Sequence, residues 1–256
     1  MPGYLFRNFR VFRGFGYNML DALLQHLINF VFLSGICFIA IGLGRLVLCR
    51  TGMKFISSSE YAVFSAGIGL GVMSYSVFIL GSLQLLYPVA IYILTGFQAV
   101  LSVAGWLILR SSPLQTSATG FIKNLLVYWP ENKTDLRNRC FDAVLFASLS
   151  AGFLLVLTPA VGNDALAYHL AVPKLYLKHH GFFFIPGNMF SHYPLNSEML
   201  YLAGIALQGD VLAKGIHFLM GLFILAGMWE FARQYVFENR FALPLSLLVF
   251  YTIPSV

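Results

Sequence analysis

The segment 162–196 holds most of the side chains in this sequence that could do chemistry. It reads GNDALAYHLAVPKLYLKHHGFFFIPGNMFSHYPLN and contains the only carboxylate between Asp142 and Glu198, which is Asp164. Four of the six histidines also lie here: His169, His179, His180 and His192. A carboxylate can accept a proton from a hydroxyl group, and lysine or histidine side chains can bind an anion. The segment is therefore the place to look for a site.

Short helices are expected to position these side chains. Asp164 follows a long apolar run and is typical of a helix N-cap. Pro173 fits the first turn of a second helix, which we expect over Lys174–His180 and which Gly181 can terminate. A third helix, short and apolar, is expected over Glu198–Gln208. Its length suits a position at a membrane interface better than a crossing.

The composition places these elements in a membrane. Apolar residues make up 59% of the 256 positions and charged residues only 10%, whereas soluble domains carry about 25% charged residues. Three runs lack Asp, Glu, Lys and Arg: Ala22–Gly44, Tyr61–Leu109 and Ala143–Asn163. Each reaches the length of about 20 residues that a helical crossing needs. The predicted fold class is all-α: a polytopic transmembrane helical bundle with an extracytoplasmic loop of short interfacial helices.

The apolar runs predict where the chain crosses the bilayer. The run Tyr61–Leu109 is too long for one crossing and divides at Tyr87-Pro88 into a tight helical hairpin. The other crossings are expected over Leu27–Leu48, Ala143–Val161 and Val211–Phe231, and a further one begins at Phe241. The chain is therefore predicted to be a multi-pass membrane protein.

Lysine and arginine set the expected orientation. If the basic segment Arg110–Asp142 is cytoplasmic, ten of the 16 basic residues lie on that side and six on the other. Basic residues favour the cytoplasmic side, so we expect the loop 162–197 outside the cytoplasm, as in a bacterial inner membrane protein. The net charge of +6 then reflects loops beside anionic membrane lipid and indicates no nucleic-acid partner.

Every candidate side chain also has a purely structural interpretation. Asp164 could only cap a helix, and Glu198 could be no more than an acid in a first helical turn. His179 and His180 suit a helix C-terminus, and Lys174 could extend its charge to the membrane surface. The tyrosines fit an aromatic belt at that surface: Tyr168, Tyr176 and Tyr193.

The order of motifs adds a family resemblance. An acidic residue follows a span and precedes two short helices and a Tyr-Pro turn. An interfacial helix that ends in Gly-Asp comes next, and the last element is a span that ends in Ala-Arg. The residues concerned are Asp164, Tyr168, His169, Pro173, Lys174, Tyr176, Gly181, Asn188, Ser191, Tyr193, Pro194, Glu198, Gly209, Asp210, Lys214 and Ala232-Arg233. This pattern, over 143–256, resembles the C-type (GT-C) glycosyltransferases. It is closest to polyprenyl-phosphate-sugar users such as protein O-mannosyltransferases and the transferases of aminoarabinose or galacturonate to lipid A. Many members carry two acidic residues in or near this loop, whereas here Asn163 precedes a single Asp164.

The resemblance implies a function. A membrane glycosyltransferase of this type, or part of one, moves a sugar from a polyprenyl-phosphate donor to an acceptor hydroxyl outside the cytoplasm. Asp164 would be the catalytic base. The residues implied in binding the donor phosphate or the substrate are Lys174, His179, His180, His192, Tyr168, His169 and Tyr193. The cofactor is left open, with a divalent cation as one source of positive charge for the departing phosphate.

The resemblance also divides the chain. Residues 1–142 form N-terminal transmembrane helices with a basic cytoplasmic loop, and residues 143–256 form the GT-C-like segment. Because Phe241–Val256 is short for a crossing, we expect only the N-terminal portion of such an enzyme, with a protein partner supplying further transmembrane helices. The alternative is a noncatalytic integral subunit that packs in a larger membrane complex. Loss of Asp164 separates the two, since only an enzyme needs it.

Overall fold

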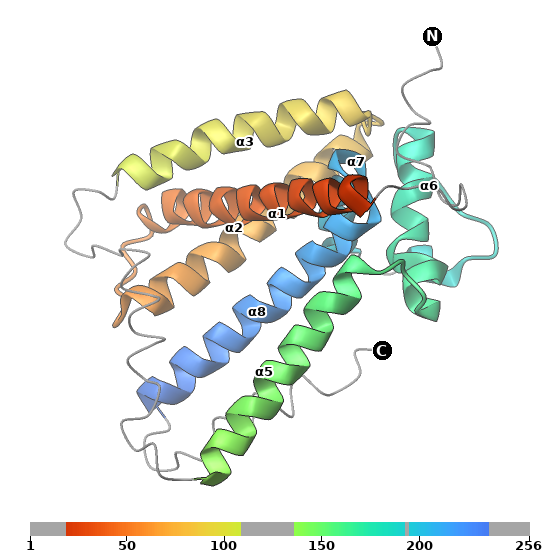
Figure 1. The fold of residues 1–256 in the computed structure, drawn as a ribbon. Helices are drawn as coiled ribbons and strands as arrows, with labels where there is room; N and C mark the ends of the chain where they lie inside the picture. Colours follow the sequence, from red (N-terminus) through yellow and green to blue (C-terminus); the bar gives the residue numbers. More distant parts are fainter. Residues whose placement is uncertain (1–18, 109–135, 193–194, 236–256) are drawn as a thin grey trace.

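The computed structural model describes residues 19–108, 136–192 and 195–235, and all regular structure in these ranges is helical. The long helices are α1 (Met19–Leu48), α2 (Ser58–Ser82), α3 (Pro88–Ile108), α5 (Leu136–Leu157) and α8 (Asp210–Tyr235). Between α5 and α8 lie a π-helix, η2 (Ala165–His169), α6 (Ala171–His179), a 3-10 helix, η3 (Met189–His192), and α7 (Asn196–Leu207). Figure 1 shows the long helices side by side, with α6 at one end of the bundle. The all-α prediction is confirmed.

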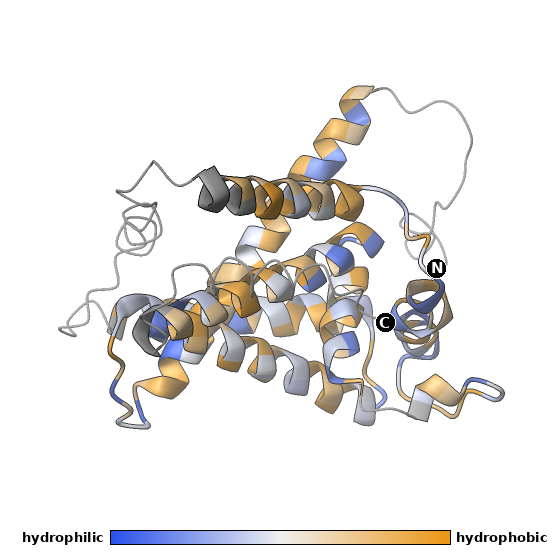
Figure 2. Ribbon diagram, turned by 90° about the horizontal axis from the view of Figure 1, so that it is seen from below, coloured by the Kyte–Doolittle hydropathy of each residue, from blue (hydrophilic) through white to orange (hydrophobic). Residues whose placement is uncertain are grey.

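Four helices are long and apolar enough to cross a membrane: α1, α2, α3 and the Asp210–Ala232 part of α8. Figure 2 shows hydrophobic residues around these helices, as expected where a helix faces lipid on one side and protein on the other. The division of the long apolar run before Pro88 is confirmed, since α2 ends at Ser82 and α3 begins at Pro88. The chain is an integral membrane protein by this measure.

The first and fourth expected crossings have different bounds in the structure. The helix α1 begins at Met19 and not at Leu27. The helix α5 ends at Leu157, short of the expected Val161, and its apolar part, Ala143–Leu157, is too short to count among the four candidate spans. Pro159 explains the early end, because proline disfavours helical backbone at the residue before it. The expected crossing at Phe241 and most of the basic segment Arg110–Asp142 lie outside the described residues.

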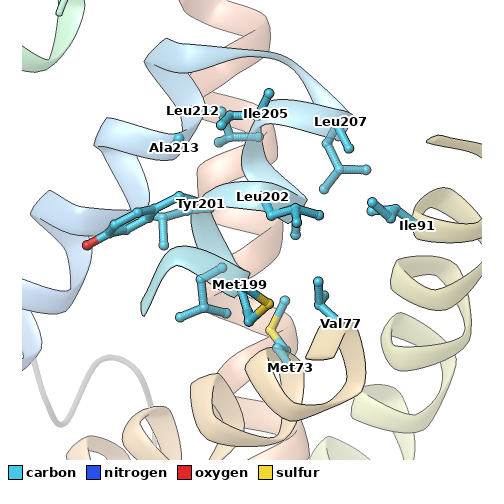
Figure 3. Packing of buried hydrophobic residues seen from close by; sticks show 14 of the residues in the cluster. Met73, Val77, Ile91, Met199, Tyr201, Leu202, Ile205, Leu207, Leu212 and Ala213 are labelled. Atoms are coloured by element: carbon cyan, nitrogen blue, oxygen red, sulfur yellow. The ribbon is translucent and has the colours of Figure 1, made fainter. Parts of the chain in front are cut away.

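The helix α7 corrects the prediction of an interfacial helix. Every residue from Glu198 to Leu207 is buried, and α7 packs against α2, α3, α6 and α8. In Figure 3, Leu202 points toward Ile91 of α3, whereas Tyr201 points toward α8. A helix that is apolar on all sides buries all of its sides, and a short helix at membrane depth is stable when protein surrounds it. The helix α7 is therefore a central core element.

The loop around α6 is anchored to the bundle. It contacts the turn between α2 and α3, where Leu86 N donates to His180 O at 2.9 Å and Phe182 N donates to Gly81 O at 3.2 Å. The side chain of Gln84 donates to Phe182 O at 2.8 Å. These bonds hold the loop against the ends of the long helices, so its side chains have defined positions.

Candidate functional site

Asp164 begins the loop but does not cap a helix. It precedes the π-helix η2 with helical backbone angles, and its side chain makes no capping hydrogen bond. The residue is half-buried, and within the described part of the chain no hydrogen bond or ion pair engages its carboxylate. The expected N-cap is therefore wrong for this residue, and the carboxylate is available to a ligand.

A buried acid–histidine pair lies at the end of the same short helix. His169 Nδ1 is 2.6 Å from Oε1 of Glu198, which is only 5% exposed. An ionised carboxylate only accepts hydrogen bonds, so the proton of this bond belongs to Nδ1. In the neutral ring the other nitrogen, Nε2, is then an acceptor, on a side chain that is 33% exposed. Glu198 thereby fixes both the tautomer and the orientation of His169.

A second polar pair joins α7 to α8. The hydroxyl of Tyr201, three residues after Glu198, is 2.6 Å from His217 Nδ1. Burial, and then the neighbouring Glu198 carboxylate, raise the pKa of Tyr201 well above its ordinary value. The phenol therefore stays protonated and donates to His217. The rings of His169 and Tyr201 meet edge to face, with centroids 6.2 Å apart, so the two pairs form one polar cluster in the apolar core.

Aromatic contacts support the outer side of this cluster. The Tyr168 ring stacks on Phe190, with centroids 4.7 Å apart, and contacts the ring of His169 at 3.9 Å. Asn188 donates to the backbone carbonyl of Ala167 at 3.2 Å. Tyr168 and His169, two of the residues expected at the substrate, are thus held in place by Phe190 and Glu198 at the end of η2.

Lys174 has a partner that the sequence analysis did not foresee. Its ammonium group lies 2.7 Å from Oδ2 of Asp210, the first residue of α8, and both side chains are about one-third exposed, at 28% and 34%. The ion pair joins α6 to the start of α8. A phosphate that binds Lys174 therefore has to compete with the carboxylate of Asp210.

His179 and His180 contact other parts of the loop and bundle. His179 packs on Phe183, with ring centroids 3.8 Å apart, and His180 stacks on Tyr87 at 4.0 Å. The expected helix bounds are also corrected here. The helix α6 begins at Ala171, and the left-handed residue that ends it is His180, with φ +61°, and not Gly181.

Two further expected residues have little structural description. His192 ends η3, and Tyr193 lies outside the described residues.

The described residues contain no group of three or more His, Cys, Asp or Glu side chains placed to hold a metal ion. Asp164 supplies a single carboxylate, and Glu198 is engaged by His169. A protein-held metal centre therefore does not fit this cluster. A divalent cation that comes with a lipid phosphate could use Asp164 as one ligand.

Sequence reasoning missed Glu198, Tyr201 and His217 as members of the cluster. The sequence places Glu198 among the residues of the family resemblance, or as no more than a first-turn acid on an interfacial helix. The available signal was the Glu198–Tyr201 spacing of three residues, which places both on one helical face, in a helix with no other charged residue. An acid in so apolar a helix needs a partner.

Comparison with family models, with curated proteins and with solved structures finds no match for this chain. The fold is that of a helical membrane protein with four helices long and apolar enough to cross a bilayer, and a polar cluster joins its short helices to α8.

Proposed function

We propose that this chain is a membrane glycosyltransferase of the GT-C type, or part of one, that transfers a sugar from a polyprenyl-phosphate donor to an extracytoplasmic acceptor. The observation that carries the proposal is the half-buried Asp164 carboxylate, which makes no capping hydrogen bond. It comes directly before the short helix η2, which carries Tyr168 and His169, and His169 pairs with the buried Glu198.

In this reaction Asp164 acts as the general base. The carboxylate takes the proton of the acceptor hydroxyl, and the hydroxyl oxygen forms a bond to the anomeric carbon of the sugar. The bond from that carbon to the phosphate oxygen breaks, and the lipid phosphate leaves from the opposite face, so the configuration inverts. His169, held by Glu198, presents Nε2 as a hydrogen-bond acceptor to a sugar hydroxyl.

A groove between α2 and α8 suits the hydrocarbon tail of the donor. Its volume is about 690 Å³, and it follows α2 from Val63 to Tyr75, which is about 18 Å at 1.5 Å per residue. Gly67 and Gly71 leave its floor open, since a Cβ at either position would meet no atom within 4 Å. A long, flexible, apolar chain fits a groove that opens laterally to lipid.

The polar end of the groove is where the donor phosphate belongs. Asn196 and Ser197, at the start of α7, line the groove, and the next residue is Glu198 of the cluster. Among the described residues no side chain caps this helix, so its first backbone N–H groups are available to an anion. Lys174 adds positive charge when phosphate displaces Asp210 from it.

The location follows from the same proposal. The Asp164 loop faces the extracytoplasmic side of a plasma membrane, as in a bacterial inner membrane, because donors of this kind deliver sugars there. The partners are membrane lipid, the polyprenyl-phosphate sugar and a protein that adds transmembrane helices.

Transfer from a labelled donor tests the proposal. Native membranes that contain the chain are incubated with radiolabelled sugars on polyprenyl phosphate, and membranes from cells that lack it serve as control. We expect chain-dependent loss of the donor, release of polyprenyl phosphate, and label in an acceptor. No chain-dependent transfer from any donor in the panel would refute the proposal and favour the noncatalytic subunit.

A further inference from the structure

Arg45 is a buried cation at the end of the bundle opposite α6, where α1 ends (Figure 1). Only 5% of the residue is exposed, and among the described residues no carboxylate forms an ion pair with it. Two acids at the same end are engaged elsewhere: Glu60 accepts a hydrogen bond from Ile56 N at 2.8 Å, and Glu230 accepts one from the Ser57 hydroxyl. A buried charge is costly unless it is paired, so the guanidinium group calls for an anion from outside this part of the chain.

The nitrogen atoms of the guanidinium group differ in their access to such an anion. Nε of Arg45 is fully enclosed and has no hydrogen-bond partner, and the same is true of the nearby Tyr61 hydroxyl. A donor and an acceptor that are both enclosed suit each other, and no ligand reaches either. The two Nη groups are different. No described residue accepts a hydrogen bond from them, and they are not among the enclosed polar atoms without a partner, so they form the accessible edge of the side chain.

The indole ring of Trp106 in α3 fixes the direction of this edge. Cζ of Arg45 lies over that ring, 4.4 Å from its centroid. The indole is itself held by α1, because its Nε1 donates to Phe38 O at 3.2 Å and its ring stacks on Phe38 with centroids 5.1 Å apart. The two helices approach closely here, since a Cβ at Gly105 would overlap the carbonyl oxygen of Gly42. A planar guanidinium stacked on a fixed ring presents its Nη groups in one direction.

The surroundings of the Nη edge indicate which anion meets it. Two parallel N–H donors match the oxygen atoms of a phosphate group or a carboxylate. Val103 and Leu107, on either side of Trp106 in the sequence, are 45% and 60% exposed and suit contact with hydrocarbon. Arg50 and Lys54 follow α1, and both are exposed. Basic pockets between membrane helices bind phospholipid headgroups where hydrocarbon gives way to a basic surface.

We propose that Arg45 binds the phosphate group of an anionic phospholipid at this end of the bundle. The two Nη groups donate to two phosphate oxygens, Arg50 and Lys54 add positive charge at the surface, and the acyl chains lie against the exposed face of α3. The site is independent of the glycosyltransferase proposal, because it lies at the opposite end of the bundle from α6 and shares no residue with the Asp164 cluster. In the orientation proposed above it belongs to the cytoplasmic leaflet, which is rich in anionic lipid.

Retention of lipid by the full chain tests the site. The chain is reconstituted in nanodiscs of phosphatidylcholine with a minor fraction of phosphatidylglycerol, and the lipids that stay bound on release are counted by native mass spectrometry. We expect the unmodified chain to retain a single phosphatidylglycerol in preference to phosphatidylcholine. Phosphatidylglycerol should also raise the unfolding temperature of the chain, whereas inorganic phosphate added to pure phosphatidylcholine nanodiscs should not.

Matched variants assign the contact to Arg45. Arg45→Met keeps a side chain of similar length against Trp106 and removes the charge, and Arg50→Met makes the same change at an exposed arginine. We expect Arg45→Met to lower the affinity for phosphatidylglycerol about tenfold or more, as for the loss of a hydrogen bond between charged groups. Arg50→Met should retain the lipid. Apolar replacement of a buried charge is often tolerated, and unfolding in pure phosphatidylcholine shows whether each variant is folded.

A third variant keeps the proposal testable if Arg45→Met does not fold. Arg45→Lys retains the charge but loses the two parallel donors, and it should lose most of the preference for phosphatidylglycerol. Equal retention by the folded Arg45 variant and by Arg50→Met would overturn the proposal, whether both keep the lipid or both lose it. Protection of the unmodified chain by inorganic phosphate to the same extent as by phosphatidylglycerol would also overturn it, since the anion would then be a soluble one.

Discussion

Glu198 is almost fully buried in a helix that has no other charged residue, and among the described residues its hydrogen-bond partner is His169. Removing one member of a buried hydrogen-bonded pair leaves the other without its partner. We therefore expect Glu198→Ala and His169→Ala each to lower the free energy of unfolding by about 1–3 kcal/mol. The double variant should lose less than the sum, with a coupling of about 1 kcal/mol. Unfolding in mixed micelles measures this cycle, and strict additivity would mean that the pair does not form.

Two roles are open to Lys174: binding of the donor phosphate, or only the attachment of α6 to α8. Substitution of its ion-pair partner Asp210 distinguishes them. If its charge binds the donor phosphate, Lys174→Ala should raise the KM for the donor severalfold with little change in kcat. Asp210→Asn should leave that KM unchanged or lower it, because the lysine is released from its carboxylate. If the ion pair only fastens α6 to α8, both substitutions should have the same small effect. Steady-state kinetics in native membranes distinguish the two.

For individual residues, the sequence predicted which segment is polar but not which side chains form pairs. Asp164 and His169 could be recognised as candidates because they lie in a loop beside a span. The contact between His169 and Glu198 joins residues 29 positions apart, and that between Lys174 and Asp210 joins residues 36 apart. Such contacts depend on how α6 and α7 pack, which local spacing does not determine.

The contact between α1 and α2 depends on a glycine at the point of closest approach. A Cβ at Gly69 would overlap the backbone carbonyl of Ala40, whereas a Cβ at Gly67 would meet nothing within 4 Å. We therefore expect Gly69→Ala to lower the unfolding temperature clearly, since overpacking of this kind costs about 1–3 kcal/mol. Gly67→Ala, in the same helix, should leave it unchanged or slightly higher. Equal effects of both would contradict the close packing of α1 on α2.

The elements that were predicted well are those whose ends are determined by residues close by in the sequence. Proline marks the start of α3, and uncharged runs mark α2 and, apart from its first turns, α1. The helix α7 was misplaced because its length suggested an interface, while its uniformly apolar surface, which reflects burial on all sides, was given less weight. The division of the chain at residue 142 is not tested by the structure.

The arrangement of the whole molecule predicts which end of the bundle faces the outside. Cys49 lies exposed just after α1, at the end away from α6, and Lys178 is exposed on α6. In a background without Cys37 and Cys140, we expect a Lys178→Cys variant to react with a membrane-impermeant maleimide in intact cells. The native Cys49 should react only after permeabilisation. The reverse pattern would invert the orientation that the ten-to-six distribution of basic residues suggests.

The central claim is that the Asp164 carboxylate is the base of a sugar transfer, and a pair of conservative substitutions tests it most directly. Asp164→Asn keeps the size of the side chain and removes its proton acceptor. Asp21→Asn makes the same change at an exposed carboxylate in the first turn of α1. Both substitutions should leave the unfolding temperature unchanged, since Asp164 makes no capping hydrogen bond and the side chain of Asp21 is exposed.

The deciding quantity is the rate of sugar transfer from the polyprenyl-phosphate donor in native membranes. A general base contributes about 10² to 10⁴ to a rate, so we expect Asp164→Asn to lose at least about 10²-fold while Asp21→Asn transfers like the unmodified chain. Transfer by a folded Asp164→Asn variant at the rate of the Asp21→Asn control would contradict the claim.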